Sequence, residues 1–180
     1  MRRLAASVAL LAASCTHGGS GGATDLDGAA VDPFAGDAPA TVLVFVATSC
    51  PVSNRYAPEI RRIHDDYASR GVRMYLVYPD KEETSAIRDH LKEHAFGAPA
   101  LRDASHVLVR RAGVSVTPEA AVFRGGAEVY HGRIDDRQVD LGVARAEPSR
   151  HDLRDAIEAA LAGKPPDETY APAVGCSITP

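Results

Sequence analysis

The chain has 180 residues, of which 45% are hydrophobic and 24% are charged, and its formal net charge is -4. This length allows one domain with a sizeable core, and the composition is that of an ordinary globular protein. A negative net charge without any basic tract excludes nucleic acid as a partner.

Residues 1–15 are typical of a secretory signal. Two arginines lie near its start, an apolar stretch covers residues 4–11, and small residues at 12–14 precede Cys15. The apolar stretch is too short for a stable membrane span. Leu-Ala-Ala-Ser-Cys also resembles the bacterial lipobox, whose cysteine becomes the lipidated first residue of the mature chain. Two alternatives stay open, a lipoprotein anchored through Cys15 or a secreted protein, and both predict export to the cell envelope, the periplasm or the outer surface.

Residues 16–37 are rich in glycine near their start and predict a flexible tether. We expect a folded domain over residues 38–164 and, because prolines interrupt the last segment, an extended C-terminal tail over residues 165–180. The tether would hold a lipid-anchored domain off the membrane, so that the protein would touch the membrane only through its lipid.

An apolar, β-branched run over residues 41–47 predicts a buried central strand. The segment 54–70 carries aromatic and aliphatic residues at helical spacing, so Cys50 lies where a strand passes into a helix. Pro51 suits the first helical position. A helix start presents unpaired N–H groups and a partial positive charge, and both favour the thiolate. Cys50 is therefore a candidate nucleophile, and the alternative is a buried, inert cysteine.

The middle of the domain is predicted to alternate between strands and helices. Residues 72–78 are expected to form a second strand. Asp80 and Glu83 form a plausible capping pair for a helix over residues 81–95. A short strand is expected at residues 99–102.

Two more helices are expected before the tail. Asp103 can cap one that ends at Gly113. Ser149, with Asp152 three residues on, caps the other, which Gly163 terminates. The apolar residues of this last helix recur at helical spacing, so we expect it to pack on the sheet.

Cys50 and its neighbours resemble the thioredoxin active site. In that family a strand is followed by C-x-x-C and by a proline eight residues after the first cysteine. Cys50, Ser53 and Pro58 reproduce this pattern with serine for the second cysteine. The sequence around Thr117-Pro118, with the hairpin that follows, resembles the thioredoxin cis-proline loop and its terminal hairpin.

The wider resemblance covers residues 38–178 and includes residues 133–137 and Gly175-Cys176. It is to secreted bacterial redoxin-domain proteins of the thioredoxin-like and peroxiredoxin-like (AhpC/TSA) superfamily. The resemblance implies an α/β, thioredoxin-like fold in which helices flank a central mixed sheet. It also implies an extra helix and strand inserted before the cis-proline loop.

The same resemblance implies how the site is built. Thr117-Pro118 would form a cis peptide bond facing Cys50, since cis bonds are essentially a proline feature. Ser53 would donate a hydrogen bond to the thiolate. Glu119 would either point toward Cys50 or be solvated, and both alternatives stay open.

Cys176 is a candidate second catalytic residue. Of the three cysteines, Cys15 is lipidated or lies next to the cleavage point, which leaves Cys50 and Cys176 in an oxidising compartment. Fully extended, the tail after Gly163 would reach about 40 Å, far enough to return to most faces of a small domain. We hypothesise that Cys176 resolves oxidised Cys50 as an intramolecular disulfide. A free or intermolecular thiol is the alternative.

These expectations favour an exported thiol-disulfide oxidoreductase that attacks with a single cysteine, Cys50. Its partners would be a protein or small-molecule disulfide and an external thiol reductant, and it would need no cofactor. One alternative is a thiol peroxidase that takes a peroxide. Another is a non-enzymatic protein, either a copper carrier using Cys50 and His131 or an accessory redoxin domain of an envelope electron-transfer complex.

One further motif resembles a metal site. His90 and His94 belong to H-x-x-E-H, a zinc-peptidase signature that places two imidazoles one helical turn apart. The domain is small and the sequence offers no third ligand downstream. We therefore interpret both as incidental surface histidines and expect no metal site.

Overall fold

The computed structural model describes residues 22–179. The predicted signal segment, Cys15 and the first part of the predicted tether lie outside the described residues. Within the described range, none of the helices has the length and apolar character that crossing a bilayer requires.

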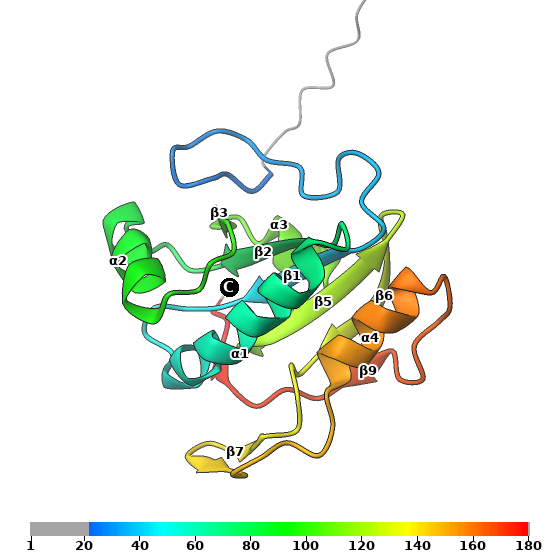
Figure 1. Ribbon diagram of the computed structural model, residues 1–180. Coiled ribbons are helices and arrows are strands. Elements are labelled where there is room, and N and C mark those ends of the chain that lie inside the picture. Colours follow the sequence, from blue (N-terminus) through cyan, green and yellow to red (C-terminus); the bar gives the residue numbers. More distant parts are fainter. Residues whose placement is uncertain (1–21, 180) are drawn as a thin grey trace, which may run out of the picture.

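A mixed sheet of six strands forms the centre of the molecule, in the order β3-β2-β1-β5-β6-β9 (Figure 1). β2 runs parallel to β1 and β3, β5 runs antiparallel to β1 and β6, and β9 runs parallel to β6. The predicted mixed sheet is therefore confirmed. Its strands are β1 Thr41–Phe45, β2 Arg73–Tyr78, β3 Ala100–Arg102, β5 Glu119–Arg124, β6 Ala127–Gly132 and β9 Tyr170–Ala171.

Helices cover both faces of this sheet (Figure 1). Val42 and Val44 of β1 pack in one core cluster with residues of α1 and α4, whereas Leu43 and Phe45 pack in a second cluster with residues of α3. Successive side chains of a strand point to opposite faces, so burial on both faces explains the unbroken apolar run. The helices are α1 Pro51–Ala68, α2 Thr84–His94, α3 Val107–Arg111 and α4 Asp152–Leu161.

α2 and β3 are the extra helix and strand that the resemblance implies before the cis-proline loop. The helix begins at Thr84, later than predicted, and the predicted capping pair of Asp80 and Glu83 is wrong. Glu83 itself occupies the N-cap position, and its side chain makes no capping hydrogen bond in the described part of the chain. The helix ends at His94, and Ala95 caps it with a left-handed backbone and φ of 51°.

Asp103 anchors its helix as predicted, although His106 occupies the N-cap position and α3 ends at Arg111, earlier than the predicted Gly113. The carboxylate of Asp103 accepts hydrogen bonds from the backbone N–H groups of residues 107–109, at 2.8 to 2.9 Å, and so anchors the start of α3. Ser149 does not cap α4, which begins at Asp152. Instead Ser149 donates its N–H (2.7 Å) and its hydroxyl (2.5 Å) to the carboxylate of Asp136.

The prediction of a flexible tether is wrong for residues 22–37, which pack against the domain. Thr24 pairs with Arg102 of the edge strand β3 through backbone hydrogen bonds of 3.0 and 2.7 Å. Phe34 lies against Phe123 of β5, with ring centroids 4.7 Å apart. Edge pairing and apolar burial fix this arm, although its glycine-rich beginning alone suggests flexibility.

The C-terminal segment returns to the domain as two short strands. β9 joins the edge of the main sheet, and β10 (Cys176–Ser177) pairs antiparallel with β4 (Val116–Thr117). In Figure 1 this segment, drawn in red, runs from β9 back toward the start of α1. The tail is therefore extended, as its prolines predict, and is held in place by strand pairing.

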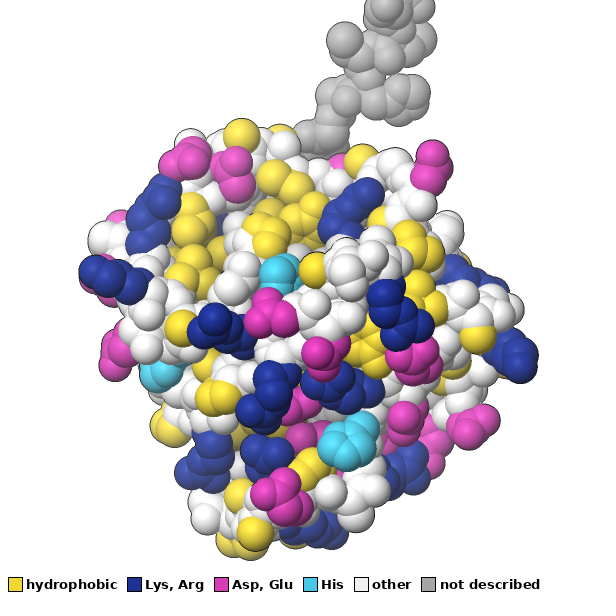
Figure 2. Space-filling view, viewed as in Figure 1, with side chains coloured by type: hydrophobic (Ala, Val, Ile, Leu, Met, Phe, Trp, Pro, Cys, Tyr) yellow, Lys and Arg dark blue, Asp and Glu magenta, His cyan; other side chains and the backbone are white. Residues whose placement is uncertain are grey.

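β7 (Gln138–Asp140) and β8 (Val143–Ala144) form a hairpin that projects from the body of the molecule (Figure 1). It exposes the apolar side chains of Val139, Leu141 and Val143. Over the face shown in Figure 2, acidic and basic side chains are interspersed and apolar side chains lie between them.

Candidate active site

Cys50 lies between the end of β1 and the first residue of α1. It takes the N-cap position with an extended backbone, and Pro51 follows at the start of the helix, as predicted. Pro51 fits because its φ is preset for a helix and its missing N–H would have no helical partner there. The local sequence thus explains why the sulfur stands at a helix N-terminus.

Cys50 is fully buried, at 0% exposure, within an apolar core cluster, and polar groups also reach its sulfur. As a thiol it donates a hydrogen bond to the backbone oxygen of Thr117 at 3.0 Å. Burial by itself would raise the pKa of Cys50. Hydrogen bonds from the Cys176 thiol, from Ser53 and from Thr117 outweigh it, so the pKa of Cys50 lies below its ordinary value. Cys50 is therefore buried, as the alternative of an inert cysteine expects, and its sulfur also has polar partners that favour the thiolate.

Ser53 lies one turn into α1 and faces the same sulfur. Its side chain is fully buried, and its hydroxyl finds no well-aligned hydrogen-bond partner among residues 22–179. Both its backbone N–H and its hydroxyl lower the pKa of Cys50. Because the Ser53 hydroxyl has no other well-aligned partner among the described residues, it can rotate to donate a hydrogen bond to the Cys50 thiolate when that thiolate forms.

Cys176 is the second sulfur of the site. β10 brings it there, because Cys176 is paired with Thr117 across the two-stranded sheet. Burial, and then the neighbouring Cys50, raises the pKa of Cys176 to about 11. Both cysteines are free thiols in the structure. The pKa of Cys50 is thus lowered and that of Cys176 raised, so Cys50 ionises first.

The cis-proline loop contacts Cys50 through the backbone oxygen of Thr117. The predicted cis bond is present between Thr117 and Pro118. Both alternatives for Glu119 are wrong, because its carboxylate is 3% exposed and accepts hydrogen bonds from the N–H groups of Ser115 (2.8 Å) and Val116 (3.2 Å). Glu119 thus fixes the short strand on which the tail is paired.

A carboxylate that sequence reasoning missed lies on the opposite side of the Cys50 loop. Glu82 precedes α2 and accepts hydrogen bonds from the N–H and the hydroxyl of Thr48, both at 3.0 Å. Burial raises the pKa of Glu82, although the bonds from Thr48 act against the rise. The insertion therefore supports the loop two residues before Cys50.

His90 also ties the insertion to the site, and its interpretation as a surface histidine is wrong. The side chain is buried and hydrogen-bonds to the Tyr78 hydroxyl (2.9 Å) and to Oδ1 of Asn54 (2.8 Å). Burial lowers the pKa of His90 to about 4, so the ring is neutral. Its spacing of three residues from the buried Ile87 was the available signal, since it places both on one face of α2.

His131 does not join Cys50. Its Nδ1 lies 2.8 Å from Oε1 of Glu128, and its ring packs against Tyr170 with centroids 4.8 Å apart. Among the described residues, no three His, Cys, Asp or Glu side chains are grouped so that they could hold a metal ion. The copper-carrier alternative therefore lacks the histidine on which it depended.

The AhpC/TSA family model matches residues 23–134 of this chain. The chain belongs to the AhpC/TSA family. The match covers Cys50 and the cis-proline loop, whereas Cys176 lies beyond its end. Comparison with curated proteins found no match.

Solved structures similar to this AhpC/TSA protein share its fold. An uncharacterized conserved protein from Geobacillus kaustophilus is 25% identical with a TM-score of 0.75, over 88% of this chain and 87% of that one. A hypothetical protein from Sinorhizobium meliloti 1021 is 27% identical with a TM-score of 0.68, over 79% and 80%. A secreted Mycobacterium tuberculosis disulfide oxidoreductase, homologous to E. coli DsbE, is 20% identical with a TM-score of 0.53, over 78% and 93%. These likenesses confirm the thioredoxin-like fold.

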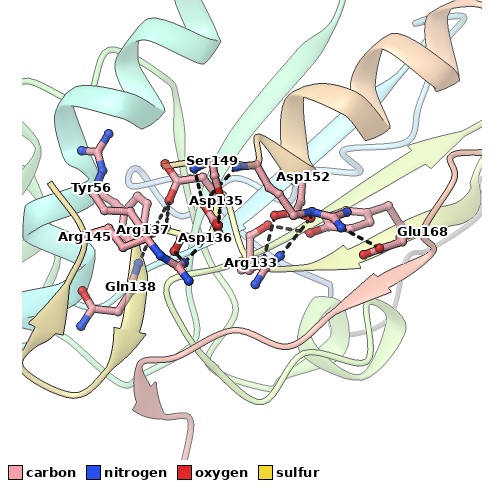
Figure 3. Close-up of polar contacts among 12 residues, drawn as sticks. Tyr56, Arg133, Asp135, Asp136, Arg137, Gln138, Arg145, Ser149, Asp152 and Glu168 are labelled. Carbon is pink, nitrogen blue, oxygen red and sulfur yellow. Dashed lines mark hydrogen bonds and ion pairs between the residues drawn. The ribbon is translucent and has the colours of Figure 1, made fainter. Parts of the chain in front are cut away.

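A buried polar network joins α1 to the loop after β6 in this AhpC/TSA domain (Figure 3). The Tyr56 hydroxyl donates to Oδ1 of Asp135 at 2.5 Å, and the N–H of Arg137 donates to the same oxygen at 2.9 Å. Burial, and then the neighbouring Asp135, raises the pKa of Tyr56. The loop is thereby fixed to α1 six residues beyond Cys50.

The same network continues toward α4 (Figure 3). The hydrogen bond from the Ser149 hydroxyl, with the N–H of Arg150, holds the pKa of Asp136 below its ordinary value. Asp152, at the first position of α4, pairs with Arg133 at 2.7 Å. These carboxylates position the helix that covers the sheet beside α1, and their partners were too distant in sequence to be predicted.

Proposed function

We propose that this protein is a thiol-disulfide oxidoreductase in which Cys50 attacks a substrate disulfide and Cys176 resolves the intermediate. The observation that carries the proposal is that both thiols meet at Thr117, because Cys50 donates to its backbone oxygen at 3.0 Å and Cys176 is paired with the same residue across β10 and β4. In addition, their pKa values are shifted in opposite directions. The Cys50 sulfur is the better nucleophile, since the thiolate is the reactive form. Cys176 stays protonated until it is needed.

The reaction has two exchange steps. In the first, the Cys50 thiolate attacks one sulfur of a disulfide R–S–S–R′, the new S–S bond forms, and R′–S⁻ leaves. In the second, Cys176 gives up its proton to a departing thiolate and attacks Cys50 Sγ, which releases R–S⁻. The substrate gains two electrons and the protein loses two, as a Cys50–Cys176 disulfide. Two molecules of an external thiol then restore both cysteines.

The order of the two steps follows from the charges. The Cys50 sulfur is one of the causes, after burial, of the high pKa of Cys176. Once Cys50 is in a mixed disulfide, its negative charge is gone and Cys176 ionises more easily. The resolving attack is thereby held back until the first exchange has taken place.

A peroxide would lead to the same end state, and membership in the AhpC/TSA family is the observation that favours this second candidate. Cys50 would attack the peroxide oxygen, release water or an alcohol, and become a sulfenic acid. Attack by Cys176 would then form the same disulfide and release water. The two candidates therefore differ in substrate and share the cysteine pair.

The two activities can be separated with wild type and Cys50→Ser. We expect wild type, but not Cys50→Ser, to accelerate the reduction of insulin by a small thiol. Thiol-dependent consumption of hydrogen peroxide by wild type alone would instead support the peroxidase. If wild type is no faster than Cys50→Ser in either assay, neither redox function stands.

We also propose that the protein is exported, with residues 1–15 as its signal and Cys15 as its lipidation site. The signal-like sequence supports this, and one protein that shares the fold is described as secreted. We expect labelled fatty acid to be incorporated into wild type but not into Cys15→Ser. Both proteins should be found in the envelope fraction or outside the cell. Retention of wild type in the cytoplasm would refute export.

A further inference from the structure

The C-terminal tail covers Cys50 by acting as a strand on the cis-proline loop. Besides the pairing of Cys176 with Thr117, the N–H of Ile178 donates to the backbone oxygen of Ser115 at 2.9 Å. The side chain of Ile178 packs against the core cluster on the α3 side. With this strand in place Cys50 has no exposed surface, and Cys176 of the tail packs against the apolar cluster that contains Cys50.

The tail can lie this close only because residue 175 is glycine. A Cβ built on Gly175 would stand 2.1 Å from the backbone oxygen of Thr117 and 2.7 Å from its carbonyl carbon. Both are backbone atoms of a loop that Glu119 holds in place, so no side-chain rotation can make room. Glycine is the residue that permits such close approach of two backbones.

The crowded atom is also part of the reactive site. The same Thr117 oxygen accepts the hydrogen bond from Cys50, and the residue directly after Gly175 is the cysteine that contacts Cys50. When a strand pairs with β4 so that its cysteine lies against Cys50, the residue directly before that cysteine lies against the backbone of Thr117. That residue must lack a side chain.

We infer that the edge of β4 is a binding site for an extended polypeptide whose reactive cysteine directly follows a glycine. This inference rests on the proposed function. Residues 173–178 are the resident occupant of the site. The substrate class is thus a peptide or protein disulfide with a Gly-Cys step. A substrate strand replaces the tail, pairs with Val116 and Thr117, and presents its disulfide to Cys50.

The reaction with such a substrate consists of two thiol-disulfide exchanges that conserve atoms and electrons. Cys50 attacks the sulfur of the Gly-Cys step, the substrate S–S bond breaks, and the second substrate sulfur leaves as a thiolate. When the tail returns, Cys176 attacks Cys50 Sγ and the substrate cysteine leaves as a thiol. The tail and the substrate compete for one edge with the same glycine-cysteine pattern, so each can replace the other.

Alkylation by iodoacetamide tests whether the tail closes the site. In a full-length C15S/C176S background Cys50 is the only thiol. Adding G175A is expected to raise the alkylation rate about tenfold or more, because a methyl group forced against backbone favours the undocked tail. G22A is the matched control, since a Cβ there meets nothing within 4 Å. Equal rates for G175A and G22A would overturn the inference.

A second variant that frees the tail shows whether faster alkylation of G175A results from tail opening or from a folding defect. I178D removes the apolar anchor of the tail and leaves Gly175 unchanged. It is expected to speed alkylation as G175A does while the far-ultraviolet circular dichroism stays that of the parent. If a folded I178D variant is alkylated no faster than its parent, the tail is not the cover of Cys50.

Peptides supplied in trans test the glycine requirement. The probes are the heptapeptide Pro-Ala-Val-Gly-Cys-Ser-Ile and its counterpart with alanine for glycine, each as a mixed disulfide with thionitrobenzoate. With the I178D variant in the C15S/C176S background, called the open variant below, the glycine peptide is expected to release thionitrobenzoate at least about tenfold faster than the alanine peptide. Equal rates would refute the glycine-selective site.

Ellman's reagent separates this inference from the proposed function, because it carries no peptide backbone. If it reacts rapidly with Cys50 of the open variant while the two peptides react equally, only the inference fails. If Cys50 of the open variant stays inert toward Ellman's reagent, the proposed nucleophile and the inference fail together.

Discussion

Replacing Glu119 with alanine is predicted to destabilise the protein by about 3 kcal/mol. In the structure the buried carboxylate accepts two backbone hydrogen bonds, from Ser115 and Val116. A hydrogen bond to a charged group contributes about 1.5–3 kcal/mol, so two of them contribute about 3–6 kcal/mol. Ser115 is exposed and Val116 half-buried, so water can replace part of the loss and we expect the lower end of that range.

Glu119→Gln is the matched control, because the amide keeps the size of the side chain and one acceptor oxygen. We expect it to lose about 1 kcal/mol, the difference between a charged and a neutral acceptor. Urea unfolding at neutral pH measures both free energies. The alanine variant should also be alkylated faster at Cys50, since the strand that holds the tail is loosened. The reasoning is refuted if the two variants are equally stable.

Three further predictions address other parts of the molecule. His90 has a folded pKa of about 4, below its ordinary value of 6.5, so the unfolded state binds more protons between these values and stability falls as pH drops through that window. The free energy of unfolding should therefore decline more steeply from pH 7 to pH 4.5 in wild type than in His90→Gln, by about 2 kcal/mol, and parallel curves would contradict this. Tyr56→Phe should cost about 1–3 kcal/mol in urea unfolding because it removes the donor to buried Asp135, and an unchanged midpoint would show that water replaces it. Cys176→Ser should retain a mixed disulfide on Cys50 after exposure to a substrate disulfide, visible as added mass, and equally rapid release by this variant and wild type would exclude Cys176 as the resolving thiol.

The sequence was sufficient wherever the signal is local. The apolar run that forms β1, the proline after Cys50 and the helical spacing of α1 together predict a cysteine at a helix start. The central mixed sheet and the cis bond at Thr117-Pro118 followed from resemblance, whereas the number and order of the strands did not. The cysteine at a helix start depends on residues that are neighbours in the chain.

Contacts between distant residues could not be predicted in the same way. Glu119 was expected to be solvated or to face Cys50, and its actual partners are N–H groups that only the fold of the loop turns toward it. The linear pattern does not place His90 in the interior, because its partners, Tyr78 and Asn54, lie on other elements. Side chains of this kind satisfy polar groups that secondary structure leaves unpaired, and a linear pattern does not identify them.

The sequence predicts the role of the C-terminal tail only in part. A lone cysteine near the end of an extended segment suggested a partner for Cys50, yet nothing in the linear pattern showed why the segment would lie on the cis-proline loop. The reason is the fit of Gly175 against Thr117, which depends on the position of two backbones.

Peptide mapping of the mildly oxidised protein under non-reducing conditions tests the central claim most directly. We predict one linked pair of peptides, joining Cys50 to Cys176 within a single chain, in most of the molecules that have lost their free thiols. Oxidised protein in which the two cysteines are found separately, or joined only between chains, would contradict the proposed pair.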